Sequence, residues 1–245
     1  MDFTPVRYQQ LLETLQSSDL SFQLRHDVDL RPESALRVAQ VEAEMGAKAT
    51  YYFRAMHFDS HADTIKAIAA LGHEAGYHYE SLTSCGGDMA KAYEDFCRNL
   101  ERLRQIVPVT TACAHGSPRS PWNSQDIWKL YDIHALGIDY EPMIDTDFSQ
   151  TLYLTDTGRR WDGWKYSIRD KVNAYQPQWT AMGLAFHGTN DIINALHNPD
   201  HILHRSGFKL LITTHPQRWQ PFGRKWLQEI ISQTIKNQVK RHLAQ

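Results

Sequence analysis

The residues whose types and spacing point most directly to chemistry are Asp27 and Asp29, which end a short apolar run that contains Phe22 and Leu24. Successive side chains of a strand alternate between its two faces, so we expect both carboxylates on the same side. Neighbouring carboxylates repel each other unless a cation lies close to them. The pair therefore predicts a metal site with a general base at a strand end. The alternative is a solvated strand end in which one aspartate caps the following helix.

Histidines follow or end several other apolar runs: His78, His115, His187 and His215. In α/β folds the functional groups gather at the C-terminal ends of the strands. Imidazole and carboxylate are ligands of borderline divalent metals such as zinc. One carboxylate, one or two imidazoles and open positions for water would form a hydrolytic metal site.

The elements that must position these residues alternate along the chain. Apolar, β-branched and aromatic runs predict strands over 20–28, 49–54, 73–79, 110–115, 182–187 and 208–214. Apolar residues at helical spacing predict helices over 33–45, 61–71, 88–106, 124–131 and 222–243. The last helix carries one apolar stripe, formed by Leu227, Ile231, Ile235, Val239 and Leu243. Strand–helix alternation predicts an α/β fold with a parallel sheet, open or closed into a barrel. Residues 140–181 are expected to hold strands and long loops.

Length and composition predict one large domain over residues 1–245. A formal net charge of −2 gives no electrostatic reason to expect nucleic acid or an anionic membrane as partner. No apolar run approaches ~18 residues, so no membrane span is expected. The first residues lack the apolar core of a signal peptide, which predicts a cytoplasmic protein. Three scattered cysteines (Cys85, Cys97 and Cys113) favour reduced packing residues over a disulfide framework.

The chain resembles the polysaccharide deacetylase family, which is carbohydrate esterase family 4 with the NodB homology fold. The resemblance covers roughly residues 20–220 and rests on Asp27-Val28-Asp29, on Gly72-His73-Glu74-Ala75-Gly76 and on the apolar strand that ends in His215. It implies a distorted seven-stranded (β/α) barrel. It also implies Asp27 as the general base, Asp29 and His78 as metal ligands and His215 as the general acid.

The sequence departs from the family pattern at the second metal histidine, expected four residues after the first. That position holds Leu82, which cannot bind a metal. His115 is preferred as the third ligand because an imidazole restores the usual ligand set, and Glu80 is the alternative. The Asp-Trp motif of the family has no clean counterpart, with Asp139 or Trp161-Asp162 as substitutes.

The resemblance implies a metal-dependent hydrolase, most simply a zinc enzyme, that removes an N-acetyl or similar acyl group from an amino sugar or saccharide precursor. Two alternatives stay open: a non-catalytic carbohydrate-binding domain that has lost its metal at Leu82, and a hydrolase of other amide C–N bonds.

Some other polar and aromatic residues have two interpretations each. Arg159 and Arg160 could bind an anionic group such as phosphate, or form a solvated pair. The tryptophans Trp161, Trp164, Trp179 and Trp219 could fill the core or stack on a sugar ring. His26, His73 and His187 are expected to be structural.

Overall fold

The computed structural model describes residues 1–117, 120–167 and 169–243. The chain groups into two compact units. Unit 1 comprises Met1–Arg25 and Asp147–Gln245, and unit 2 comprises His26–Thr146. The assignment of residues 1–245 to one catalytic domain stays a prediction.

Six strands are found in the described residues, and they form one sheet in the order β4-β3-β2-β1-β6-β5. Their bounds are β1 (Phe22–Val28), β2 (Ala49–Phe53), β3 (Glu74–Tyr79), β4 (Ala112–Ala114), β5 (Thr151–Thr155) and β6 (Lys209–Thr214). The pairs β2/β3, β3/β4 and β5/β6 are parallel. The α/β class with parallel strands is therefore confirmed, and the described residues supply six strands where the family resemblance implied seven.

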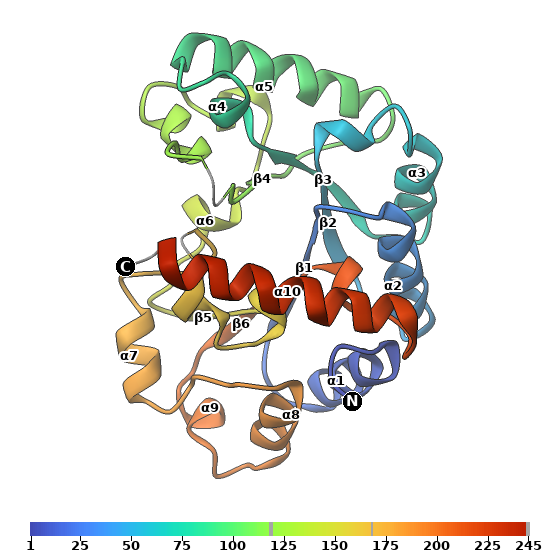
Figure 1. Cartoon of the computed structure of the whole chain (residues 1–245), viewed down its shortest axis with the longest axis vertical. Helices are drawn as coiled ribbons and strands as arrows, with labels where there is room; N and C mark the ends of the chain where they lie inside the picture. The colour runs from blue at the N-terminus through green and yellow to red at the C-terminus, as the bar shows by residue number, and fades with distance from the viewer. Residues whose placement is uncertain (118–119, 168, 244–245) are drawn as a thin grey trace. The chain divides into compact units, whose positions relative to one another are not determined.

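Unit 2 holds the second half of β1, the strands β2 to β4 and the helices that connect them. These are α2 (Pro32–Glu44), α3 (Ala62–Ala70), α4 (Ser81–Ser84), α5 (Met89–Arg104) and α6 (Pro142–Asp145), with 3-10 turns η1 (Ala55–His57), η2 (Ser124–Lys129) and η3 (His134–Leu136). Figure 1 shows α2 and α3 side by side next to the strands, and α5, which contacts β3, at the top of the view. Pro32 begins α2, and the Asp88 carboxylate caps α5 by accepting the Lys91 N–H. The predicted helix over 124–131 is a 3-10 helix, and the other predicted helices of this unit are confirmed.

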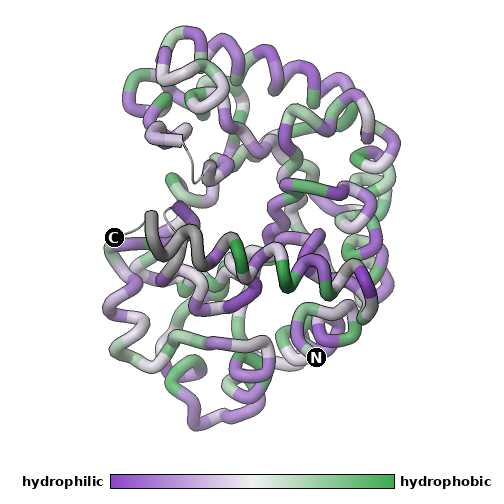
Figure 2. Tube along the Cα trace, viewed as in Figure 1, coloured by the Kyte–Doolittle hydropathy of each residue, from purple (hydrophilic) through white to green (hydrophobic). Residues whose placement is uncertain are grey.

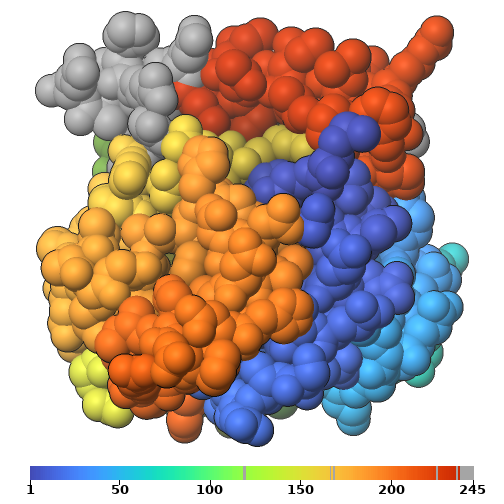
Figure 3. Space-filling view, turned by 90° about the horizontal axis from the view of Figure 1, so that it is seen from below, coloured from blue at the N-terminus to red at the C-terminus, as the bar shows by residue number. Residues whose placement is uncertain are grey.

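Unit 1 holds the first half of β1, the pair β5/β6 and the remaining helices. These are α1 (Pro5–Ser17), α7 (Gln176–Ala181), α8 (Thr189–His197), α9 (Ile202–Arg205) and α10 (Arg224–Leu243), with 3-10 turns η4 (Thr157–Arg159), η5 (Gly163–Tyr166) and η6 (Pro216–Arg218). Helix α1 packs against α8, and Figure 3 shows the N-terminal segment (blue) between the orange residues of α8 and the red α10.

The strand predicted over 182–187 is wrong. Leu184 and Phe186 are buried, as residues of a strand would be, but Leu184 donates its N–H to the Trp179 carbonyl at the end of α7. The alternating apolar residues lie in a buried loop that follows α7. A buried segment of this kind shows the pattern of a strand without pairing with a neighbouring strand.

Helix α10 presents its predicted apolar stripe to solvent. Leu227, Ile231 and Ile235 are 53%, 53% and 60% exposed. Figure 2 shows green, hydrophobic segments alternating with purple, hydrophilic ones along α10. The side chains of Val239 and Leu243 lie outside the described residues. The helix contacts the rest of unit 1 through residues such as Trp226 and Asn237, which bond to Asp2 and Gly158. None of the helices described combines the length and hydropathy that a membrane span requires.

Candidate metal centre

Three side chains predicted as metal ligands come together in unit 2. Asp29 directly follows β1, His78 lies in β3, and His115 directly follows β4. Asp29 Oδ1 lies 3.5 Å from His78 Nε2 and 3.4 Å from His115 Nε2. One ligand atom of each residue lies within 4.8 Å of the others. This separation suits a single ion, because metal–ligand bonds to nitrogen and oxygen are about 2.0–2.2 Å long.

The backbone explains why these strand ends meet. Strands β3 and β4 are parallel neighbours, with His78 opposite Cys113, and His115 donates its backbone N–H to the Tyr79 carbonyl (2.7 Å). At the end of β1, the Asp29 carbonyl accepts hydrogen bonds from His57 Nε2 (3.1 Å) and Arg54 Nη1 (3.5 Å). The position of Asp29 is thus fixed by residues that follow β2.

Both imidazoles are oriented by acceptors on their Nδ1 atoms. His78 Nδ1 lies 3.0 Å from the Cys113 carbonyl oxygen, and His115 Nδ1 lies 3.1 Å from Glu80 Oε2. A carbonyl or carboxylate oxygen can only accept, so the hydrogen resides on Nδ1 in each ring. The lone pair is then on Nε2, the atom that faces Asp29. This is the arrangement by which proteins orient histidines that bind metals.

Glu80 lies behind His115 rather than beside Asp29. Its other oxygen, Oε1, accepts a hydrogen bond from Arg54 Nη2 at 2.6 Å. Burial raises the pKa of the Glu80 carboxyl, but the hydrogen bonds and charges of His115 and Arg54 outweigh burial and hold the pKa at about 2. Glu80 is therefore an anionic partner of His115, and the geometry favours His115 over Glu80 as the third ligand.

Asp27 lies beside the same group. Its side chain is buried (5% exposed), and its Oδ2 lies 3.8 Å from His78 Nε2. Both aspartates thus approach one imidazole, as expected from alternation along a strand. Cys113 is buried, and its sulfur lies within 4.8 Å of ligand atoms of Asp27 and His78.

Leu82 belongs to a hydrophobic cluster. It lies in α4, is 1% exposed and packs with Ala92 of α5 and Ile127 of η2. The position at which the family carries its second metal histidine therefore contributes to the core in this chain.

In unit 1, His215 forms a tight pair with Asp156. Asp156 follows β5 and His215 follows β6, and the parallel register of these strands aligns Thr155 with Thr213. Asp156 Oδ1 lies 2.6 Å from His215 Nδ1 and 2.6 Å from Arg218 Nη1.

Asp156 accepts further hydrogen bonds from the His215 backbone N–H and from Trp219 Nε1, at 3.1 and 2.8 Å. Burial of this carboxyl raises its pKa, but the charges and hydrogen bonds of Arg218 and His215 outweigh it and hold the pKa at about 2. Asp156 is not among the site residues predicted from the sequence, although it directly follows an apolar run, as His215 does.

The histidines that were expected to be structural, and the substitutes for the Asp-Trp motif, bond to other groups of the fold. His26 bonds to the buried Glu42 (2.8 Å), and His73 bonds to the Ala39 carbonyl (2.9 Å). His187 is exposed beside Arg160. Among the possible substitutes for the Asp-Trp motif, Asp139 is exposed and Asp162 is paired with Arg160. Three tryptophans fill the core: Trp161, Trp179 and Trp219.

No protein-family model and no curated protein matches this sequence. In fold, the chain is similar to several solved structures. A family 4 carbohydrate esterase from Streptomyces lividans in complex with acetate has 12% identity and a TM-score of 0.46, and the match covers 92% of this chain and 91% of that one. A carbohydrate esterase of the same family from Streptococcus mutans has 14% identity and a TM-score of 0.46, with 96% and 85% covered.

A pseudoenzyme of the same family from Bacillus anthracis has 10% identity and a TM-score of 0.43. The match covers 90% of this chain but 61% of that one, so this chain spans about three fifths of its length. These three solved structures are proteins of carbohydrate esterase family 4, and each shares 10–14% identity with this chain.

Proposed function

We propose that this protein is a metal-dependent hydrolase that removes an N-acetyl group from an amino sugar or saccharide precursor. The observation that carries the proposal is the group Asp29, His78 and His115, in which both imidazoles turn Nε2 towards the carboxylate. One carboxylate and two neutral imidazoles form a ligand set that suits zinc and leaves positions for water and substrate. Such an ion, when bound, supplies a Lewis acid that polarises the acetyl carbonyl and acidifies the attacking water.

The side chains around this group have distinct tasks in the proposal. Asp27 takes the proton of the attacking water, since its carboxylate lies next to the ligand atoms without being needed to complete their set. His115 and His78 are held in their ligand orientation by Glu80 and by the Cys113 carbonyl.

His215 has the role of general acid in the proposal, as the family resemblance implies. Its Nδ1 hydrogen bonds to Asp156, so Nε2 is the nitrogen that can exchange a proton with the departing amine. The Asp156 carboxylate stabilises the protonated ring, as the carboxylate of a catalytic dyad does. The choice of an acetylated amino sugar as substrate is supported by the sequence motifs.

Elemental analysis of the purified protein tests the metal site. We expect about one equivalent of a divalent metal in the wild type after reconstitution with zinc, and its loss in Asp29→Ala and in His115→Ala. Glu80→Ala should still bind the metal, but more weakly, because the carboxylate acts through His115. If His115→Ala retains the metal and Glu80→Ala loses it, the ligand assignment is wrong.

Release of acetate from acetylated amino sugars tests the reaction. Asp27→Asn should bind the metal normally and lose about 10²-fold or more of its activity, because the general base is removed while the ligands stay. Wild-type activity in Asp27→Asn would rule out the proposed base.

The second candidate is a carbohydrate-binding domain without metal, and the burial of Leu82 favours it, because the family's second imidazole is absent. Calorimetry separates the two functions. Saccharide binding that a chelator leaves unchanged, together with no release of acetate, would support the binding domain against the hydrolase.

A further inference from the structure

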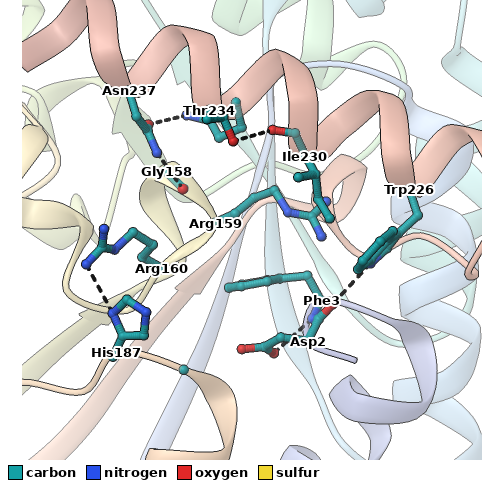
Figure 4. A pocket seen from close by; sticks show the side chains of 12 residues that line it. Asp2, Phe3, Gly158, Arg159, Arg160, His187, Trp226, Ile230, Thr234 and Asn237 are labelled. Atoms are coloured by element: carbon teal, nitrogen blue, oxygen red, sulfur yellow. Dashed lines mark hydrogen bonds between the residues drawn. The ribbon is translucent and has the colours of Figure 1, made fainter.

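Unit 1 contains a cavity that none of the roles above uses. Its volume is about 410 Å³, which lies within the range of about 300–1,000 Å³ that is typical of small-molecule sites. Figure 4 shows the N-terminal residues on one side, η4 on another and α10 above. The residues that matter for its chemistry are Asp2, Phe3, Arg159, Trp226, Gln233 and Asn237.

Arg159 is the charged group that dominates this cavity. It is 9% exposed, and its guanidinium lies 5.2 Å from the ring centre of Phe3 and 5.4 Å from that of Trp226. Its Nη1 donates to the Arg218 carbonyl at 3.3 Å, and no ion pair within the described part of the chain includes it. Burial lowers the pKa of Arg159, whereas the charges of Glu229 and Asp156 raise it. A buried cation without a carboxylate partner is costly, so a missing anion is the simplest reason for its presence.

The backbone that carries Arg159 is strained. Gly158 and Arg159 have φ angles of +75° and +56°, and a non-glycine residue adopts such angles at a cost in free energy. Asn237 of α10 fixes this turn, because its Nδ2 donates to the Gly158 carbonyl at 3.0 Å. A Cβ atom added at Gly158 would lie 3.1 Å from Asn237 Oδ1. The strain is thus maintained by packing and directs one arginine into the cavity.

The oxygens of the acidic residue in the cavity, Asp2, are already engaged in hydrogen bonds. The Asp2 carboxylate accepts the backbone N–H groups of Phe3 and Thr189 (2.8 and 2.9 Å) and the Thr189 hydroxyl (2.5 Å). Arg160, which also lines the cavity, is paired with Asp162. Arg159 is therefore the group through which the cavity attracts a ligand.

We propose that this cavity binds the phosphate group of a small phosphorylated compound through Arg159. The planar guanidinium matches two phosphate oxygens at once. The amides of Gln233 and Asn237 line the same cavity and can bond to hydroxyl groups of the ligand, which favours a sugar phosphate. The site lies within unit 1 and does not depend on the metal centre.

Isothermal titration calorimetry on chelator-treated protein tests the proposal, since without metal the centre in unit 2 does not bind phosphate. The probes are glucose 6-phosphate, inorganic phosphate, glucose and glucuronate. We expect glucose 6-phosphate to bind most tightly, inorganic phosphate more weakly, and glucose and glucuronate weakest. Failure of both phosphate probes to bind would overturn the site, and tighter binding of glucuronate would overturn the choice of phosphate.

The matched variants are Arg159→Asn and Arg31→Asn. Both arginines have a φ of +56°, a conformation that asparagine tolerates, but Arg31 is exposed and lies outside the cavity. Arg159→Asn should weaken glucose 6-phosphate binding at least about tenfold, and Arg31→Asn should leave it unchanged. Equal affinities of the wild type and Arg159→Asn would refute the proposal.

A second variant guards against misfolding of Arg159→Asn. Thr234 also lines the cavity, is exposed, and its hydroxyl bonds within α10 and not to the turn of Gly158. Thr234→Asp keeps Arg159 and the bond from Asn237 to Gly158 and adds a negative charge at the cavity wall, so it should also weaken phosphate binding while leaving the circular dichroism spectrum unchanged. Undiminished binding of glucose 6-phosphate to a folded Thr234→Asp protein would count against the site.

Discussion

Replacement of Asp156 by asparagine should change how stability depends on pH. The carboxyl is fully buried, and its pKa falls from 3.8 to about 2 because Arg218 and His215 stabilise its ionised form. A pKa that is lower in the folded than in the unfolded protein stabilises the fold above the unfolded value. That stability is lost as the pH falls from about 4 towards 2, because the unfolded chain takes up the proton first.

The contribution of Asp156 to the free energy of unfolding follows from the difference between its pKa in the unfolded and in the folded protein. The fall of the Asp156 pKa from 3.8 to about 2 corresponds to about 2 kcal/mol of stability at pH 5 and to about 1 kcal/mol at pH 3. Asp156→Asn removes this contribution and also leaves the buried Arg218 without its carboxylate, which costs about 3 kcal/mol or more near neutrality. Urea denaturation at both pH values gives the free energy of unfolding of each protein. The stability difference between wild type and variant should shrink by about 1 kcal/mol from pH 5 to pH 3.

The control is Asp200→Asn, because Asp200 is 85% exposed and pairs only with the exposed Arg205. That variant should differ from wild type by no more than about 0.5 kcal/mol at either pH. A wild-type minus Asp156→Asn difference that stays constant from pH 5 to pH 3 would refute the pKa argument. If Asp156→Asn lowers the free energy of unfolding by less than about 1 kcal/mol at pH 5, the contacts of Asp156 with Arg218 and His215 do not stabilise the fold as argued.

Three further substitutions test separate parts of unit 2. Glu80→Gln should weaken zinc binding about tenfold, measured by competition with a chromophoric chelator, because His115 loses an anionic partner; unchanged affinity would contradict this. Glu42→Ala should lower the free energy of unfolding in urea by about 3 kcal/mol or more, since it strips the fully buried His26 of its partner; a loss below about 1 kcal/mol would exclude a stabilising pair. Gly76→Ala should cost about 1–3 kcal/mol in the same assay, because its Cβ would lie 2.6 Å from the Tyr52 ring; wild-type stability would mean that the ring moves freely.

Local sequence patterns were sufficient to predict those features of the fold that depend on a single strand. The β-branched and aromatic residues of β2 and the apolar run of β6 predict their strands, and alternation along β1 correctly predicts that Asp27 and Asp29 approach one partner. These inferences require only the periodicity of a single strand.

Relations between distant segments could not be predicted in the same way. The choice between His115 and Glu80 depends on how the ends of β3 and β4 meet, which local periodicity does not specify. Asp156 was missed because β5 lies within a stretch of mixed polar and aromatic residues. The stripe of α10 was identified, but the face that packs is determined by contacts with residues such as Asp2, more than two hundred positions away.

The burial of Leu82 also bears on how this chain can evolve. Histidine at that position would enter a cluster with Ala92 and Ile127, so the single change is expected to lower stability before it could provide a ligand. Among the described residues, His78 and His115 are the imidazoles grouped with Asp29, so loss of His115 removes one of the two. A ligand at position 82 in place of His115 would therefore require further substitutions in the packing partners of Leu82, because the single change disturbs the core first.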